Sequence, residues 1–168
     1  DCIVTLSNTK KIFAMTELIS ESLWKDYCQT RVLFELEGIH YRLLPNSQGD
    51  NNWPWQGNVS DVFIVSAIHP RSRQSSNDEI VLLNQRMIET LDELTLNYIM
   101  CIGKPARDDW PEEESFLITD ARETTIIELC RAFDQNAYFH WTEKFWSVKG
   151  IFANQSHQGG WTLESSHP

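Results

Sequence analysis

The sequence of 168 residues has little glycine and no long apolar run. Its seven glycines are spread thinly along the chain, so it contains no glycine-rich loop of the kind that cradles phosphate groups. No apolar stretch approaches the ~20 residues that a transmembrane helix needs, and no signal-peptide-like region opens the chain. These absences argue against a nucleotide fingerprint and a membrane span, and they predict a soluble, cytoplasmic protein.

Positive charge is also scarce. Fourteen lysines and arginines stand against 24 acidic residues, which gives a net charge of −10 and a pI near 4.9. Such a balance disfavours direct binding to nucleic acid or to an anionic membrane surface. The only arginine cluster is Arg71 and Arg73, in HPRSRQSSN. One alternative interpretation takes the acidity itself as the function, in a protein that competes with nucleic acid for a basic partner.

The four cysteines, Cys2, Cys28, Cys101 and Cys130, are widely spaced and include no Cys-x-x-Cys pair. Cys101 lies in a strand-like run and Cys130 in a helical pattern, where buried free thiols are common. The five histidines show none of the spacings typical of zinc sites. The sequence therefore predicts reduced cysteines, with no metal and no cofactor.

Hydrophobic periodicity divides the chain into alternating helices and strands. A helix follows Thr16 as its N-cap, and two short strands or one bent strand lie between Val32 and Leu44. The clearest strand is the apolar run that begins at Val62. After it, Ser76 and Glu79 form a capping-box pattern at the start of a long helix. Further segments predict two strands, a helix that opens at Asp120, and one or two closing strands up to residue 150.

From Val62 onward the predicted order is strand, helix, strand, strand, helix, strand. This order predicts an α+β fold with a ferredoxin-like βαββαβ unit, in which the helices pack on a mixed sheet. The N-terminal helix and the extra strands would cover a face or extend an edge. We expect a single α+β domain over residues 16–152, a possible extension over 1–15, and a flexible tail over 153–168, which is polar and unpatterned.

Several short motifs together resemble a bacterial domain family of unknown function. The sequence has VFIVSAIHPRSR, then Asn84 in the next helix, then Trp110, Glu113 and Ser115, then FDQNAYFHW. The family pattern has Ala-Trp-Asn-Pro, an Asn in the helix, Trp-x-x-Glu-x-Ser and Gln-Asn-Ala in this order. The resemblance covers residues 62–141 and implies a shared fold unit and surface, without an activity. Ile68 and His69 stand where the family has Trp and Asn, which leaves the role of that pair open.

The stretch DWPEEES offers candidate acid–base chemistry. In an extended strand entry the side chains alternate, so Glu113 should face away from Glu112 and Glu114. Either these carboxylates form a charged loop before a buried strand, or one of them is functional. Glu113 is the candidate because it fits the family pattern.

The preferred candidate site lies where the central strand ends, at His69, Arg71 and Arg73. Ligands gather at strand ends in open sheets, and a helix start and two arginines favour an anion. Alternatively, both arginines pair with surface glutamates. The bend that contains Gln135 and Asn136 is a further candidate, although Asn136 also suits a left-handed helix cap.

Taken together, the sequence predicts binding of a polar or anionic small molecule, or of a partner chain. The candidate ligand-binding residues are His69, Arg71, Arg73, Asn84, Trp110, Glu113, Gln135 and Asn136. An alternative function is that of a small-substrate enzyme, with Glu113 or His140 as general acid or base. His140 follows in a strand-like run beside Trp141, which also fits a buried structural imidazole.

Overall fold

The computed structural model of the protein describes residues 19–46, 48 and 52–166. Within these residues the chain forms eight strands, three α-helices and one 3₁₀ turn. Their bounds, in chain order, are α1 (Glu21–Cys28), β1 (Arg31–Leu36), β2 (Ile39–Asn46), β3 (Val62–Ser66), η1 (Pro70–Ser72), α2 (Asn77–Glu93), β4 (Asn97–Lys104), β5 (Glu113–Thr119), α3 (Glu123–Ala132), β6 (Ala137–Trp141), β7 (Trp146–Gly150) and β8 (Ser156–Ser166).

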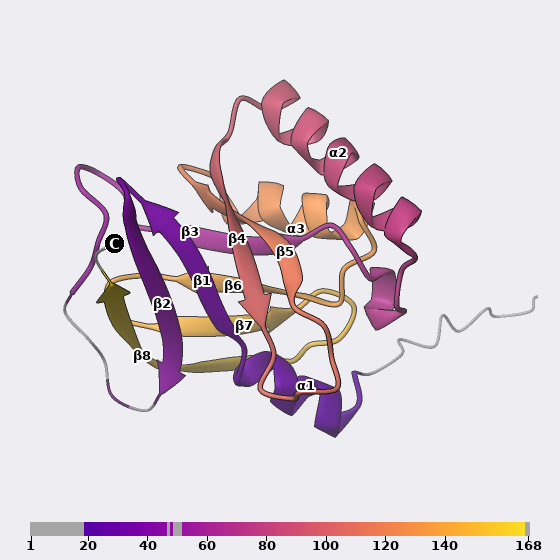
Figure 1. Cartoon of the computed structure of the whole chain (residues 1–168), viewed down its shortest axis with the longest axis horizontal. Helices are drawn as coiled ribbons and strands as arrows, with labels where there is room; N and C mark the ends of the chain where they lie inside the picture. The colour runs from indigo at the N-terminus through magenta and orange to yellow at the C-terminus, as the bar shows by residue number, and fades with distance from the viewer. Residues whose placement is uncertain (1–18, 47, 49–51, 167–168) are drawn as a thin grey trace, which may run out of the picture.

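The strands form a closed antiparallel barrel. Their order around it is β1-β2-β8-β7-β6-β3-β5-β4, and β4 pairs with β1 to complete the circle. Helices α2 and α3 lie together on one side of the barrel, whereas α1 lies at one of its ends, near the loop that joins β4 to β5 (Figure 1). Because each strand has two hydrogen-bonded neighbours, the barrel leaves no open sheet edge.

The predicted α+β fold with a ferredoxin-like βαββαβ unit and a mixed sheet is wrong. The elements expected after Val62 are present, and β6, β3, β5 and β4 lie side by side with every pair antiparallel. This sheet does not end at its outer strands, however. Strand β4 continues into β1, and β6 continues into β7. The strands outside the unit close the sheet on itself rather than covering a face or extending an edge.

The chain enters the barrel through a tight hairpin. Leu36 pairs with Ile39, so only Glu37 and Gly38 form the turn, with φ values of 53° and 77°. A two-residue loop with both residues left-handed matches the right-handed twist of the flanking strands. The region predicted as two strands or one bent strand is therefore two strands.

Strand β8 occupies most of the segment that was expected to be a flexible tail. It pairs with β7 through its first half and with β2 through its second half. Trp161 and Leu163 alternate into the interior, and the Trp161 indole N–H donates to the Thr142 carbonyl at 2.9 Å. The expected extension over 1–15 and the N-cap expected at Thr16 lie outside the described residues, and Ser20 is the N-cap of α1.

Aromatic rings fill the interior of the barrel. The buried side chains that alternate inward form one cluster, in which Trp141, Trp146 and Trp161 are at most 1% exposed. Trp53 packs its ring edge-on against Trp141 at a centroid distance of 4.9 Å. Because these side chains fill the middle of the barrel, open space for a ligand lies at its ends or on its outer surface.

A second apolar cluster lies between the barrel and helices α2 and α3. It joins Met87 and Leu91 of α2 and Ile126 of α3 to the outward side chains of β3, β5 and β6. The capping box that was predicted for α2 is confirmed. Helix α3 begins later than predicted, since its N-cap is Arg122 and Asp120 has a left-handed φ of 57°.

Truncation of the central tryptophan should destabilise the protein strongly. Trp141→Ala removes a fully buried side chain, and we expect a loss of about 3–5 kcal/mol in the free energy of unfolding. Val81→Ala, at a position that is 64% exposed, should change it by less than about 1 kcal/mol. Urea unfolding of both variants checks this. Equal changes in the free energy of unfolding at the two positions would contradict a dominant contribution of the interior cluster to stability.

Candidate functional site

The loop after β3 has an unusual backbone. His69, Arg71 and Ser72 have φ values of 55°, 53° and 60°, so three of four consecutive residues are left-handed although none is glycine. Each such residue costs roughly 1–2 kcal/mol relative to ordinary backbone. Strain of this kind persists only where surrounding contacts impose it, and it often marks a functional site.

Contacts from several parts of the chain hold this loop in place. His69 and Ser75 bond reciprocally: the His69 amide donates to Ser75 Oγ at 3.1 Å, and the Ser75 amide donates to His69 Nδ1 at 2.9 Å. Because Nδ1 accepts, the neutral His69 ring carries its proton on Nε2. From the bend after α3, the Gln135 side chain donates to the Ile68 carbonyl at 3.0 Å, and the Asp134 carbonyl accepts from the Arg71 amide.

Beside this loop, a pocket of about 200 Å³ opens between α1, the β4–β5 loop and the ends of the strands. We call it the end pocket. Its lining combines carboxylates, hydroxyls, aromatic rings and aliphatic side chains: Leu23, Asp26, Tyr27, Thr30, Ser72, Gly103, Pro105, Arg107, Trp110 and Glu113. Three of these residues, Leu23, Asp26 and Tyr27, belong to α1, so the pocket lies at the barrel end that α1 borders.

Glu113 is the largely buried carboxyl group of the end pocket. It lies on the same face of β5 as the inward residues Ser115 and Leu117. The sequence predicted that Glu113 faces away from Glu112 and Glu114. Trp110 donates its indole N–H to Glu113 Oε1 at 2.8 Å. Burial raises the pKa of Glu113, and the hydrogen bonds from Trp110 and Ser66 oppose this only in part.

Next to Glu113, two hydroxyl groups connect α1 to the strained loop. The Tyr27 hydroxyl and Ser72 Oγ are 2.9 Å apart, and Asn136 Nδ2 donates to the same Ser72 oxygen at 2.9 Å. Burial raises the pKa of Tyr27, and the negative charge of Glu113 raises it further. Asn136 therefore binds the strained loop through Ser72. The left-handed residue after α3 is Asp134, with a φ of 54°, and not Asn136 as the capping alternative proposed.

The structure brings five of the eight candidate residues together, namely His69, Trp110, Glu113, Gln135 and Asn136. The rings of His69 and Trp110 meet edge to face, with centroids 5.9 Å apart.

The other three candidates point elsewhere. The Arg71 guanidinium stacks on Phe152 at 3.9 Å from the ring centroid and lies 4.0 Å from Asp134. Arg73 pairs with Glu79 at 3.7 Å, as the alternative interpretation of the arginines proposed. Asn84 donates to Glu114 on the outer face of β5 at 2.6 Å. None of these side chains lines the end pocket.

His140 belongs to a different polar cluster, on the outer surface of β6. Its ring stacks on Phe63 at 4.6 Å, and its Nε2 lies 2.6 Å from Asp61 Oδ1. Lys149 approaches His140 Nδ1 at 3.4 Å and also pairs with Glu123. Asp61 precedes the first residue of β3, whereas Glu113 lies near the last, so the two acid–base candidates occupy separate sites.

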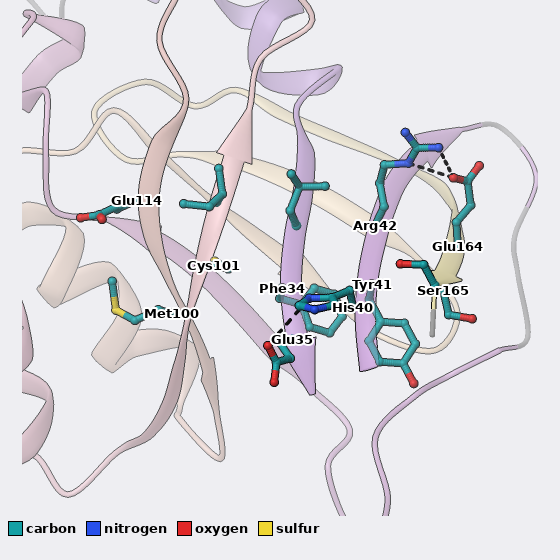
Figure 2. Close-up of a pocket in the computed structure, with 13 residues that line it drawn as sticks. Phe34, Glu35, His40, Tyr41, Arg42, Met100, Cys101, Glu114, Glu164 and Ser165 are labelled. Atoms are coloured by element: carbon teal, nitrogen blue, oxygen red, sulfur yellow. Dashed lines mark hydrogen bonds and ion pairs between the residues drawn. The ribbon is translucent and has the colours of Figure 1, made fainter. Parts of the chain in front are cut away.

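A larger hollow of about 690 Å³ lies on the barrel surface that no helix covers, across β4, β1, β2 and β8. We call it the outer groove. Figure 2 shows its polar side chains paired with each other: Arg42 binds Glu164, and Glu35 faces His40 at 3.8 Å. These residues are about half exposed. The outer groove therefore lacks a buried polar group, and the end pocket is the stronger candidate site.

Sequence reasoning missed several residues of the end pocket. Tyr27 lies among apolar residues at helical spacing, and Ser72 lies between two arginines. Thr30, Gly103 and Arg107 carry no local signal, because their contribution depends on the folding of α1 and the β4–β5 loop over the barrel end. The available hint for Ser72 is its position between two arginines in the segment that follows a buried strand.

Over its described residues the protein is an eight-stranded antiparallel barrel with a polar pocket at one end. Residues 65–138 match the model of a family described as protein of unknown function (DUF3293). This match confirms, for that segment, the resemblance to an uncharacterised domain family. The segment runs from β3 into β6 and includes His69, Trp110, Glu113 and Gln135.

The chain matched no curated protein and no solved structure. Among the residues that the structure describes, no helix is both long and apolar enough to cross a bilayer.

Replacement of the buried carboxyl should change how stability depends on pH. Because the folded pKa of Glu113 is raised, its contribution to stability is fully present below the usual glutamate pKa of about 4.3 and is lost as the pH rises through the folded value. Glu113→Gln removes this loss. The free energy of unfolding of the variant should therefore gain on that of the wild type as the pH rises above about 4.3.

Urea unfolding at several pH values measures this difference. The matched control is Glu112→Gln, which removes a neighbouring carboxyl that is 53% exposed and should follow the wild-type curve. If the Glu113→Gln and wild-type curves stay parallel over the whole range, the raised pKa is refuted.

Proposed function

We propose that the protein binds a small polar molecule in the end pocket. The observation that carries this proposal is the largely buried carboxyl of Glu113, with its raised pKa, in a pocket of about 200 Å³. Pockets in which a few polar groups converge on an otherwise apolar wall are the usual binding sites for small molecules. Leu23, Pro105 and Trp110 supply that wall here.

Two energetically unfavourable features at this end of the barrel support a functional role. Desolvation disfavours the ionised form of Glu113, and the left-handed residues of the loop store strain. Neither feature is needed to close the barrel, whose strands pair without them. Both become useful if they hold polar groups in fixed positions around a ligand.

The expectation of an anionic ligand rested on Arg71 and Arg73. Because both arginines contact residues outside the end pocket, we propose a polar ligand bound by the carboxyl and hydroxyl groups. The pocket volume fits a small molecule or one side chain of a partner chain.

Filling the pocket tests the proposal. Gly103 lines the end pocket, and a Cβ there would meet its nearest atoms at 3.7–3.8 Å, which is ordinary contact. Gly103→Ala should therefore fold and still bind, whereas Gly103→Leu should fill the space and weaken binding by at least about tenfold, since a ligand buried there would clash. A fragment screen by ¹H–¹⁵N spectroscopy supplies the ligands. Equal binding to both variants would place the ligand elsewhere.

A second candidate function is catalysis by Glu113 as a general acid. A carboxyl with a raised pKa in a pocket is a specific feature of such enzymes, because it retains its proton closer to neutral pH.

Product analysis separates catalysis from binding. Each fragment found to bind is incubated with the protein at a saturating concentration and examined by mass spectrometry. If Glu113 is the acid, the wild type should convert a bound compound, and Glu113→Gln should lower kcat by about 100-fold or more. Conversion at the wild-type rate by Glu113→Gln contradicts this role.

A further inference from the structure

The end pocket contains more hydrogen-bond acceptors than available donors. Thr30 Oγ1 already donates to the Asp26 carbonyl at 3.0 Å, and the Trp110 indole already donates to Glu113. Arg107 donates to the Asp26 carboxylate at 3.1 Å and holds Asp109 through two further N–H groups. Five of the seven N–H and O–H donors on these three side chains are therefore committed, and the other two are N–H groups of Arg107, whereas the carboxylate and hydroxyl oxygens can still accept.

The hydroxyl groups of Tyr27 and Ser72 also have few free protons to donate. Ser72 Oγ accepts from Asn136, so the hydroxyl pair has two protons, of which one forms the bond between the two oxygens. One hydroxyl proton is left to face the carboxyl group or a ligand. Apart from the two remaining N–H groups of Arg107, the side chains named here thus offer a single free hydroxyl donor beside several acceptors.

The distribution of charge also favours a ligand that donates hydrogen bonds, and in particular a positively charged one. Among the side chains that the structure describes, no lysine or arginine nitrogen lies within 4.0 Å of the Glu113 carboxylate, whereas Asp26 and Asp109 both hold Arg107. The whole chain carries a net charge of −10, which attracts cations and repels anions at long range. A positive ligand would supply the partner that the ionised Glu113 lacks.

We propose that the ligand of the end pocket is a small primary amine, and this inference rests on the proposed function. The ammonium group has three donors and no acceptor, which matches a lining of acceptors. It donates to Glu113 and to hydroxyl oxygens of the Tyr27–Ser72 pair. A short aliphatic part lies against Leu23, Pro105 and the Trp110 ring, and the pocket volume of about 200 Å³ accommodates it.

Three matched probes test the class of ligand: butylamine, butanol and butyrate, which share an alkyl chain and differ in their polar group. The reporter is the indole N–H resonance of Trp110, assigned with a Trp110→Phe variant. At pH 7.5 butylamine should shift this resonance and bind at least about tenfold more tightly than either other probe, because it forms a charge-assisted bond to Glu113. Its affinity should rise with pH above the usual glutamate pKa of about 4.3, as Glu113 ionises.

Glu113→Gln should reduce the affinity for butylamine by about tenfold or more, to the level of butanol. Glu112→Gln removes the same charge from the adjacent residue, which lies outside the pocket, and should leave the affinity within about twofold. Far-UV circular dichroism of both variants confirms that they are folded.

The outcomes separate the two proposals. If butanol or butyrate binds at Trp110 as tightly as butylamine, the ligand is not an amine, but the end pocket remains a binding site. If butylamine binds equally well to Glu113→Gln and to the wild type, the assigned role of the carboxyl is wrong. If no probe shifts Trp110, the amine inference fails, and the Gly103 variants decide separately whether the pocket binds anything.

Discussion

The closure of the sheet between β4 and β1 is the constraint on which the rest of the structure depends. Through it every one of the eight described strands has two antiparallel neighbours within the barrel, to which its backbone can hydrogen-bond. Closure also fixes which side chains face inward. Bulky aromatic rings occupy the interior, and the helices cover only the side formed by β3, β5 and β6. Positions for chemistry are left at the barrel ends.

At the end bordered by α1, two unfavourable features are stabilised by the same set of contacts. The strained loop is held by Ser75 and, from the bend after α3, by Gln135, and the largely buried Glu113 accepts from Trp110 of the β4–β5 loop. The barrel brings the β4–β5 loop and the bend after α3 to one place. The site is therefore rigid because it joins segments that are far apart in sequence, and a ligand would meet groups already positioned.

The local elements were predictable from the sequence, whereas their assembly was not. The capping box at Ser76 and the apolar run from Val62 depend on neighbouring residues, and both were found as predicted. Barrel closure depends instead on pairs such as Leu43 with Leu163, which are 120 positions apart. Strand β8 in particular is rich in serine and glycine, so its composition resembled that of a tail. Its only signal was the alternation of Trp161 and Leu163.

The same distinction between local pattern and tertiary assembly explains which residues of the candidate site could be predicted. The family-like motifs identified Trp110 and Glu113, and the end of the apolar strand that begins at Val62 identified His69. Partners such as Tyr27 come from an element whose position depends on tertiary packing, and no local pattern marks them. The arginines were predicted from their charge and from their position between a strand end and a helix start, and their charge is engaged by Asp134 and Glu79 at the surface.

The separation of Glu113 from His140 follows from the geometry of a single strand. Strand β3 runs from beside Asp61, which bonds His140, to Ser66, which bonds Glu113. Five residues of extended chain span roughly 17 Å, because each adds about 3.3 Å. His140 is also enclosed between the Phe63 and Phe145 rings and held by Asp61, which is the environment of a structural imidazole. A small ligand cannot contact both ends of this strand, so any acid–base chemistry of the end pocket must use Glu113 with the groups around it.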